Sequence, residues 1–255
     1  MTGEQTRAHD PTVLRRASRL AALITAGAGI GFGVLAVLSW WLLRNDRSAL
    51  SMAEDPWAYY VETGLGGSTI AGLYLLPFSA ILFLWFIVAL RGWIRGTQVR
   101  RNMLISDLQL VSGLAFTAVF LVGSGATATA LVMAGSEEGE VAFESLRALA
   151  TFGDTLMSVI GVRMAAVFVL ATSSLGVTTS VLPRWFYLLG FGFGLVLMLA
   201  PIVTSTLIVA FPVWVAALAT MLLWHLVRLP EDELPGFAER YPETVAAQGR
   251  SGFDD

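Results

Sequence analysis

The chain has 255 residues, of which 56% are hydrophobic and only 14% charged, and its mean hydropathy is +0.70. A soluble domain carries about 25% charged residues, and a helical bilayer span uses about 20 mostly apolar residues. The composition therefore excludes an ordinary soluble protein and predicts an all-α, polytopic integral membrane bundle of about six transmembrane helices. The net charge of −3 adds little, because charges in membrane proteins are informative by their location.

The chain contains no cysteine, which excludes disulfides, thiolate metal sites and a cysteine nucleophile. Its two histidines, His9 and His225, both fall outside the predicted hydrocarbon core, so haem or zinc ligands are lacking there. We predict no cofactor, no metal, no catalytic residue and no nucleic-acid partner.

The first predicted span, from about Leu20 to Leu43, follows a cytoplasmic N-terminal segment, 1–19. A cleaved signal peptide is the alternative, but its apolar region covers about 7–15 residues and ends at small side chains. This one is longer and ends at Trp40 and Trp41, which favours a retained span. A polar loop is expected at 44–69, with an aromatic cluster of the kind that sits at headgroup level.

The second span is predicted from about Ile70 to Ile94, with Pro77 expected to bend it. An arginine-rich connection, 91–107, leads to the third span, from about Leu108 to Met133.

From Ser145 to Thr179 the helical pattern is longer than one bilayer thickness and contains Asp154 and Arg163. The segment either lies along the outer interface as far as Met157 and then spans, or it spans earlier and buries both charges. We prefer the first interpretation, because a charge at the bilayer centre costs a few kcal/mol or more. It places Arg163 near the outer edge, where its guanidinium can reach the headgroups.

A fifth span is predicted from about Trp185 to Ala200, and a sixth ends near Val227. The six-helix domain thus covers 20–228, and the acidic tail, 229–255, is expected to be mostly disordered and cytoplasmic.

The arginines predict the orientation of the bundle. With six spans, twelve of the sixteen basic residues, all arginine, fall on the side that carries both termini. Because arginine-rich short loops stay in the cytoplasm, we expect a plasma-membrane protein with cytoplasmic termini.

Charged residues inside a span are functional candidates by default, which singles out Asp154 and Arg163. Nine residues apart, they lie about 180° from each other on an ideal helix and cannot pair. Thr151, Asp154, Ser158 and Gly161 follow helical spacing. We interpret this stripe as a solvated interfacial face; a polar helix contact and a proton- or ion-coupling site remain alternatives.

Glycines recur at the spacing that lets membrane helices approach closely. The GxxxG pairs are Gly27 with Gly31, Gly29 with Gly33, and Gly190 with Gly194. We expect them to serve packing within the bundle, with a homo-oligomer interface as the alternative.

Three segments, together about a fifth of the chain, are LPFSAILFLWFIVALRG (76–92), RMAAVFVLATSSLGVTTSVLPRW (163–185) and FPVWVAAL (211–218). They resemble a group of uncharacterised actinobacterial multi-pass membrane proteins. In that group an arginine before MAAVF and a later LPRW recur, so Arg163 and Arg184 match. The resemblance implies a six-helix fold and brings no known activity.

These observations favour a non-enzymatic accessory or scaffold protein whose partners are the lipid bilayer and either a second copy or another membrane protein. The first alternative is a small-solute or ion transporter that uses Asp154 and Arg163, and it predicts that both side chains face a cavity within the bundle. The second is a membrane-embedded, lipid-acting enzyme, which requires carboxylates or histidines gathered at one membrane face.

Overall fold

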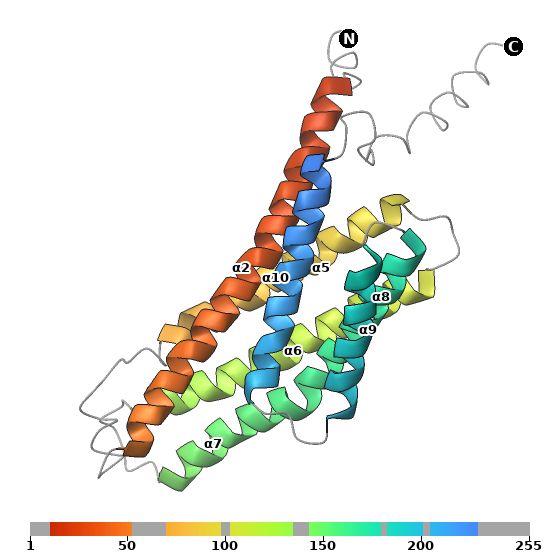
Figure 1. The fold of residues 1–255 in the computed structure, drawn as a ribbon. Coiled ribbons are helices and arrows are strands. Elements are labelled where there is room, and N and C mark those ends of the chain that lie inside the picture. The colour runs from red at the N-terminus through yellow and green to blue at the C-terminus, as the bar shows by residue number, and fades with distance from the viewer. Residues whose placement is uncertain are drawn as a thin grey trace, which may run out of the picture.

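The structure, a computed structural model, describes residues 11–52, 70–97, 103–134, 143–179, 183–200 and 205–228. These stretches are helical and contain no strand, so the predicted all-α helical bundle is confirmed. Four helices are long and apolar enough to cross a membrane, and two shorter apolar helices accompany them. Figure 1 shows the helices packed lengthwise into one elongated bundle.

The elements follow one another in this order: α2 (Pro11–Met52), the π turn η1 (Ala71–Leu75), α5 (Leu76–Thr97), α6 (Met103–Ala134), α7 (Phe143–Thr155), the π turn η3 (Leu156–Gly161), α8 (Val162–Thr179), α9 (Arg184–Leu199) and α10 (Ser205–Arg228). The bounds of α9 and the end of α10 lie within a residue or two of those predicted. Helix α2 is longer than predicted at both ends and runs through 44–52, where we expected a loop. Those nine residues contain neither glycine nor proline, so no breaker ends the helix there.

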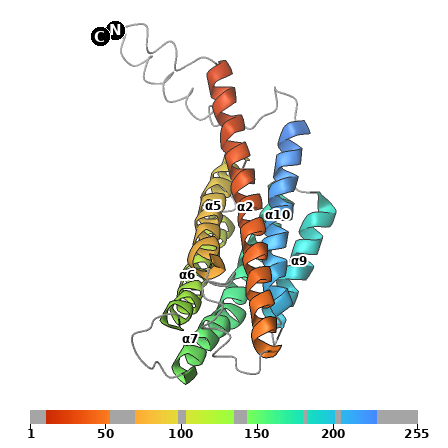
Figure 2. The same cartoon turned by 90° about the vertical axis from the view of Figure 1, so that its left-hand side faces the viewer.

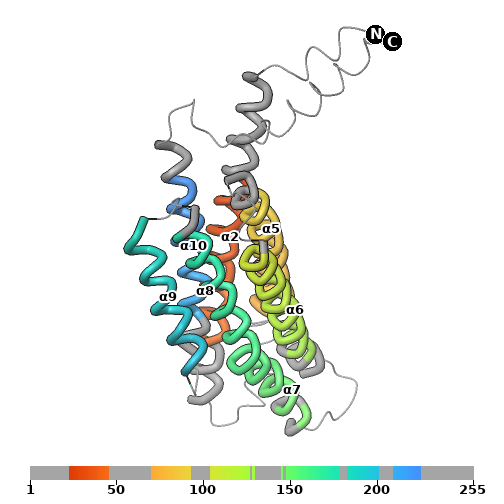
Figure 3. Tube along the Cα trace, turned by 90° about the vertical axis from the view of Figure 1, so that its right-hand side faces the viewer, coloured from red at the N-terminus to blue at the C-terminus, as the bar shows by residue number. Residues whose placement is uncertain are grey.

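The segment 143–179 is one continuous helical rod, in which η3 joins α7 to α8. Both α7 and α8 pack along α6, as Figure 3 shows, so α7 does not turn away across the end of the bundle. This arrangement differs from the preferred interpretation of the sequence, in which residues up to Met157 lay along the outer interface. Packing against α6 holds the segment upright, and that contact cannot be read from local sequence.

The helices pack in a simple pattern. Helix α2 lies against α5 and α10, α6 lies against α5, α7 and α8, and α9 lies on the outside of α8. Figure 2 shows α2 and α10 side by side.

Phenylalanine side chains fill the centre of the bundle. Seven of them, contributed by five helices, are buried: Phe32, Phe83, Phe86, Phe116, Phe120, Phe168 and Phe211. Ring centroids lie 4.5 Å apart for Phe32 and Phe83 and 4.7 Å apart for Phe116 and Phe211. Aromatic pairs at such distances each add about 0.5–1.5 kcal/mol beyond the area they bury. The interior is therefore a dense aromatic layer that joins α2, α5, α6, α8 and α10.

The predicted aromatic cluster of the 44–69 loop and the tail, 229–255, lie outside the described residues.

Candidate functional site

Two contacts set the register between the antiparallel helices α6 and α8; Arg163 belongs to α8, and Asp154 to α7, which precedes it in the same rod. Near one end, Gln109 Nε2 donates a hydrogen bond to Thr172 Oγ1 at 3.2 Å. Further along, a side chain added at Gly161 would lie 3.4 Å from Val119 Cγ1. Counting from these contacts gives the level of each residue along the bundle.

Asp154 and Arg163 lie at different levels. Among the described side chains the apolar window of α6 covers Leu104–Ala126, and the apolar sequence continues to the end of the helix at Ala134. Asp154 is level with Ala126, about eight residues before that end, whereas Arg163 is level with Thr117, close to the middle of the helix. The segment packs upright against α6 from Phe143 onwards. The depth of Arg163 in a bilayer stays a prediction.

Arg163 is half-buried, and its Nη1 donates to the carbonyl oxygen of Val159 at 2.5 Å. The π turn η3 lies directly before Arg163. Val162 N–H bonds to Met157 O, one residue further back than in an α-helix. When the ladder returns to the α pattern, one carbonyl near Val159 is left without an amide donor, and the guanidinium bonds to a carbonyl at this point.

The π turn also changes the angle between the two charges. It holds one more residue than an α turn, which rotates later side chains back by about 100°. The 180° separation expected for a regular helix is thereby reduced to about 80°. Asp154 is exposed on the surface of the bundle.

The four residues of the predicted polar stripe face different surroundings. Thr151 and Asp154 are exposed, and the hydroxyl of Ser158 bonds to the Thr155 carbonyl oxygen at 3.3 Å. Gly161 is buried against α6. The four residues do not line one cavity.

The glycines of α2 face three different surroundings. A Cβ added to Gly33 would lie 2.6 Å from Ala216 Cβ, and one added to Gly29 would lie 2.6 Å from Ala219 Cβ, so this pair is in close contact with α10. Gly31 lies against Leu82 of α5. Gly27 is exposed and has nothing within 4 Å of an added Cβ.

Gly190 and Gly194 both face α8. An added Cβ would lie 2.2 Å from Ser173 Oγ at Gly190, and 2.7 Å from Leu170 Cγ at Gly194. At Gly190 an added Cβ would require the Ser173 hydroxyl to rotate away, and both glycines lie against side chains of α8. The GxxxG pair of α9 thus forms an intramolecular contact.

Sequence reasoning missed a group of buried polar side chains at the α6–α8 seam and beside it. Gln109 is fully buried; its Nε2 donates to Thr172 Oγ1, whereas its Oε1 has no hydrogen-bond partner. The Oγ atoms of Ser106 and Ser173 and the indole nitrogen of Trp214 are also buried without a partner. The sequence did contain a signal for this group: Gln109 follows Ser106 by three positions within an apolar stretch, so both fall on one helix face.

At the same end of the bundle, Arg91 of α5 forms a salt bridge with Asp107 of α6. The pair joins the end of α5 to the beginning of α6, and the Asp107 side chain is half-exposed.

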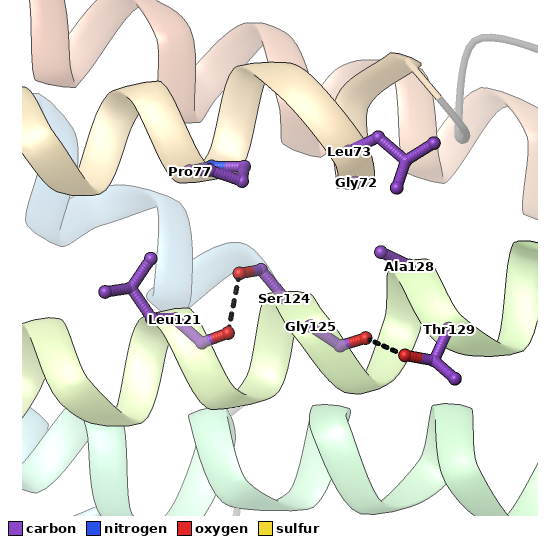
Figure 4. Close-up of a pocket in the computed structure, with 8 residues that line it drawn as sticks. All are labelled: Gly72, Leu73, Pro77, Leu121, Ser124, Gly125, Ala128 and Thr129. Atoms are coloured by element: carbon purple, nitrogen blue, oxygen red, sulfur yellow. Dashed lines mark hydrogen bonds between the residues drawn. The ribbon is translucent and has the colours of Figure 1, made fainter.

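A shallow recess of about 400 Å³ lies between η1 and α6, towards the opposite end (Figure 4). Its two hydroxyls are already bonded to their own helix, Ser124 to Leu121 O at 3.0 Å and Thr129 to Gly125 O at 2.8 Å. Pro77 also faces the recess and has no N–H, so a carbonyl of the preceding π turn lacks its amide donor. The recess is chiefly apolar and offers no acid, base or nucleophile.

Within the described part of the chain, no three His, Cys, Asp or Glu side chains are grouped so as to hold a metal ion. Compared with known proteins, the chain matches no family model, no curated protein and no solved structure.

Proposed function

We propose that the chain is a plasma-membrane protein of six transmembrane helices that acts as a non-enzymatic accessory or scaffold protein. The observation that carries this proposal is the aromatic interior. Phe83 lies 5.3 Å from Phe116 and 5.4 Å from Phe168, measured between ring centroids, and all three are buried. A transporter needs a polar path through the centre of the bundle, which the phenylalanine side chains fill. A densely packed centre instead suits a protein that binds its partners on the outer faces of its helices.

The proposed topology places both termini in the cytoplasm, on the arginine-rich side. Arg44 lies over the Trp40 ring, 5.3 Å from its centroid, at the opposite end of α2, as expected of an interfacial anchor. The substitutions Thr97→Cys and Glu138→Cys test this topology, because the natural chain has no cysteine. A membrane-impermeant thiol reagent should label position 138 in intact cells and position 97 only after permeabilisation; labelling of both from outside contradicts six spans.

The transport alternative requires Asp154 and Arg163 on one cavity within the bundle. The exposed position of Asp154 does not favour that arrangement. Purified protein in liposomes, assayed for proton and sodium flux with internal dyes, should leak no faster than protein-free liposomes. Flux that is lost in both Asp154→Asn and Arg163→Gln would replace our proposal with transport.

The enzymatic alternative needs acidic or histidine side chains gathered at one face. Its candidates, Glu137 to Glu144, have no described side chains. No described residue group favours this alternative over the accessory role.

Photo-crosslinking in the native membrane tests the accessory role directly. Benzoylphenylalanine is introduced singly at exposed positions on three helices, replacing Val34, Val111 or Leu188. The matched control replaces the buried Phe83, which should crosslink only within the chain. An accessory protein should give one recurring partner band from one helix face, and deletion of the chain should lower the abundance of that partner. Crosslinks to lipid alone would refute the proposal; crosslinks only to a second copy would support a scaffold that assembles with itself and would exclude the accessory role for another protein.

A further inference from the structure

The following inference rests on the proposal that the bundle spans a bilayer. In that case Arg163 lies near the middle of the hydrocarbon core, where membrane proteins rarely carry a charge. Its Cα is about two residues from the middle of the α6 apolar stretch, or about 3 Å along the helix axis. Helical side chains point towards the N-terminal turn, so the guanidinium is directed away from the Arg91–Asp107 end. Its bond to Val159 O shows this direction.

A guanidinium has five N–H donors, and among the described residues the hydrogen bond from Arg163 goes to Val159 O alone. Its remaining donors need acceptors, because unsatisfied polar groups are costly in hydrocarbon. Water is scarce at this level. The acceptor best matched to the planar fork of a guanidinium is a carboxylate or a phosphate.

Helix α9 ends near the level of this arginine. Its 16 residues extend about 24 Å, less than the about 30 Å of a hydrocarbon core. Leu197 packs with Val162 and Ala166 of α8, which places the last residue of α9, Leu199, level with Arg163. Beyond that level the surface of η3 is exposed at Val159 and Ile160.

We infer that Arg163 binds the phosphate of a glycerophospholipid from the leaflet beyond the end of α9. The short helix lets a headgroup settle below its usual plane at this point. The guanidinium donates to the phosphate oxygens while its Nη1 remains bonded to Val159 O. Local thinning and snorkelling are the established ways in which a bilayer accommodates an arginine.

The test is native mass spectrometry of the full-length, delipidated protein, titrated with phosphatidylglycerol, with phosphatidylcholine, or with a galactosyl diacylglycerol of the same acyl chains. The variants are Arg163→Gln and Arg163→Lys. The matched control is Arg184→Gln, which removes an exposed arginine at the opposite end of the bundle. Inorganic phosphate is added as a competitor.

Wild-type protein and Arg184→Gln should bind one molecule of either phospholipid about 10-fold more tightly than the glycolipid, as expected for one charge-assisted contact. Arg163→Gln should lose this preference, and Arg163→Lys should keep only part of it because lysine lacks the fork. An unchanged preference in Arg163→Gln overturns the inference. Competition by millimolar inorganic phosphate would also overturn it, in favour of a soluble anion.

If Arg163→Gln does not fold, solid-state NMR decides with the wild-type protein in phospholipid bilayers. Recoupling between lipid ³¹P and arginine ¹³Cζ should give one buried contact that disappears in Arg163→Lys; the same spectrum for both proteins overturns the inference. The outcome is separable from that of the spanning proposal. If the bundle does not span a bilayer, wild-type protein binds neither lipid class, whereas failure of this inference alone leaves both classes binding equally.

Discussion

The contact between α2 and α10 gives a sharp test of how the bundle is held together. In Gly33→Ala, the new Cβ would lie 2.6 Å from Ala216 Cβ and 2.9 Å from the Pro212 carbonyl oxygen. Optimal carbon–carbon contacts are about 3.5–4.0 Å, so the helices must separate by about 1 Å. Overpacking of this kind costs about 1–3 kcal/mol, against a gain of up to about 1 kcal/mol in helix propensity when alanine replaces glycine.

Gly27→Ala is the matched control, because it lies on the same helix and its added Cβ meets nothing within 4 Å. It gains the propensity without the clash. We therefore expect Gly33→Ala to unfold more easily than Gly27→Ala by about 1–3 kcal/mol. The measurement is an SDS titration of each purified variant in mixed micelles, followed by far-UV circular dichroism.

The double variant Gly33→Ala/Ala216→Gly removes the closest of the two contacts and should recover part of the loss. Non-additivity of about 1 kcal/mol is typical of residues in direct contact. Equal stability of Gly33→Ala and Gly27→Ala would refute the packing argument, and so would a double variant no more stable than the sum of its parts.

Three further predictions concern the polar contacts and the first π turn. Thr172→Val leaves the buried Gln109 Nε2 without an acceptor and should lower the free energy of unfolding by about 1 kcal/mol, whereas Gln109→Leu removes both polar atoms and should change it less; SDS titration measures both. Pro77→Ala restores an amide donor, so the π turn before it should relax to an α turn, visible as a new amide proton at position 77 that is protected from exchange; rapid exchange of this proton would contradict the expectation. The salt bridge of Arg91 with the half-exposed Asp107 should contribute less than about 1 kcal/mol and weaken in high salt, as a double-mutant cycle at two ionic strengths would measure.

The helical fold and the approximate positions of the apolar helices could be predicted because apolar length is a local property of the sequence. The errors occurred where helix ends depend on tertiary contacts. Helix α2 continues to Met52 since no breaker interrupts it, although the residues after Arg44 are polar. The GxxxG spacing identified three candidate pairs, but Gly27 is exposed while Gly33 is in close contact with α10. Spacing does not indicate which face of a helix meets a neighbour.

The candidate charges show the same limit more clearly. Asp154 and Arg163 could be singled out from the sequence, but their levels depend on the register between α6 and α8, which is fixed by distant pairs such as Gln109 with Thr172. Their relative angle depends on the π turn between them. A π turn exchanges one backbone bond for another, and nothing in the residues Leu156–Gly161 distinguishes it from an α-helix, whereas Pro77 does explain the turn η1.

The departures from regular structure are concentrated in one half of the bundle. The turns η1 and η3 and the end of α9 all lie on the side away from Arg91 and Asp107, and each leaves backbone carbonyls without amide donors. The other half is regular and held by the α6–α8 hydrogen bond and the α8–α9 glycine contact. Because a hydrocarbon environment penalises unpaired carbonyls, each π turn needs a donor from outside the regular amide ladder. Beside η3 the Arg163 guanidinium supplies one, through its bond to Val159 O.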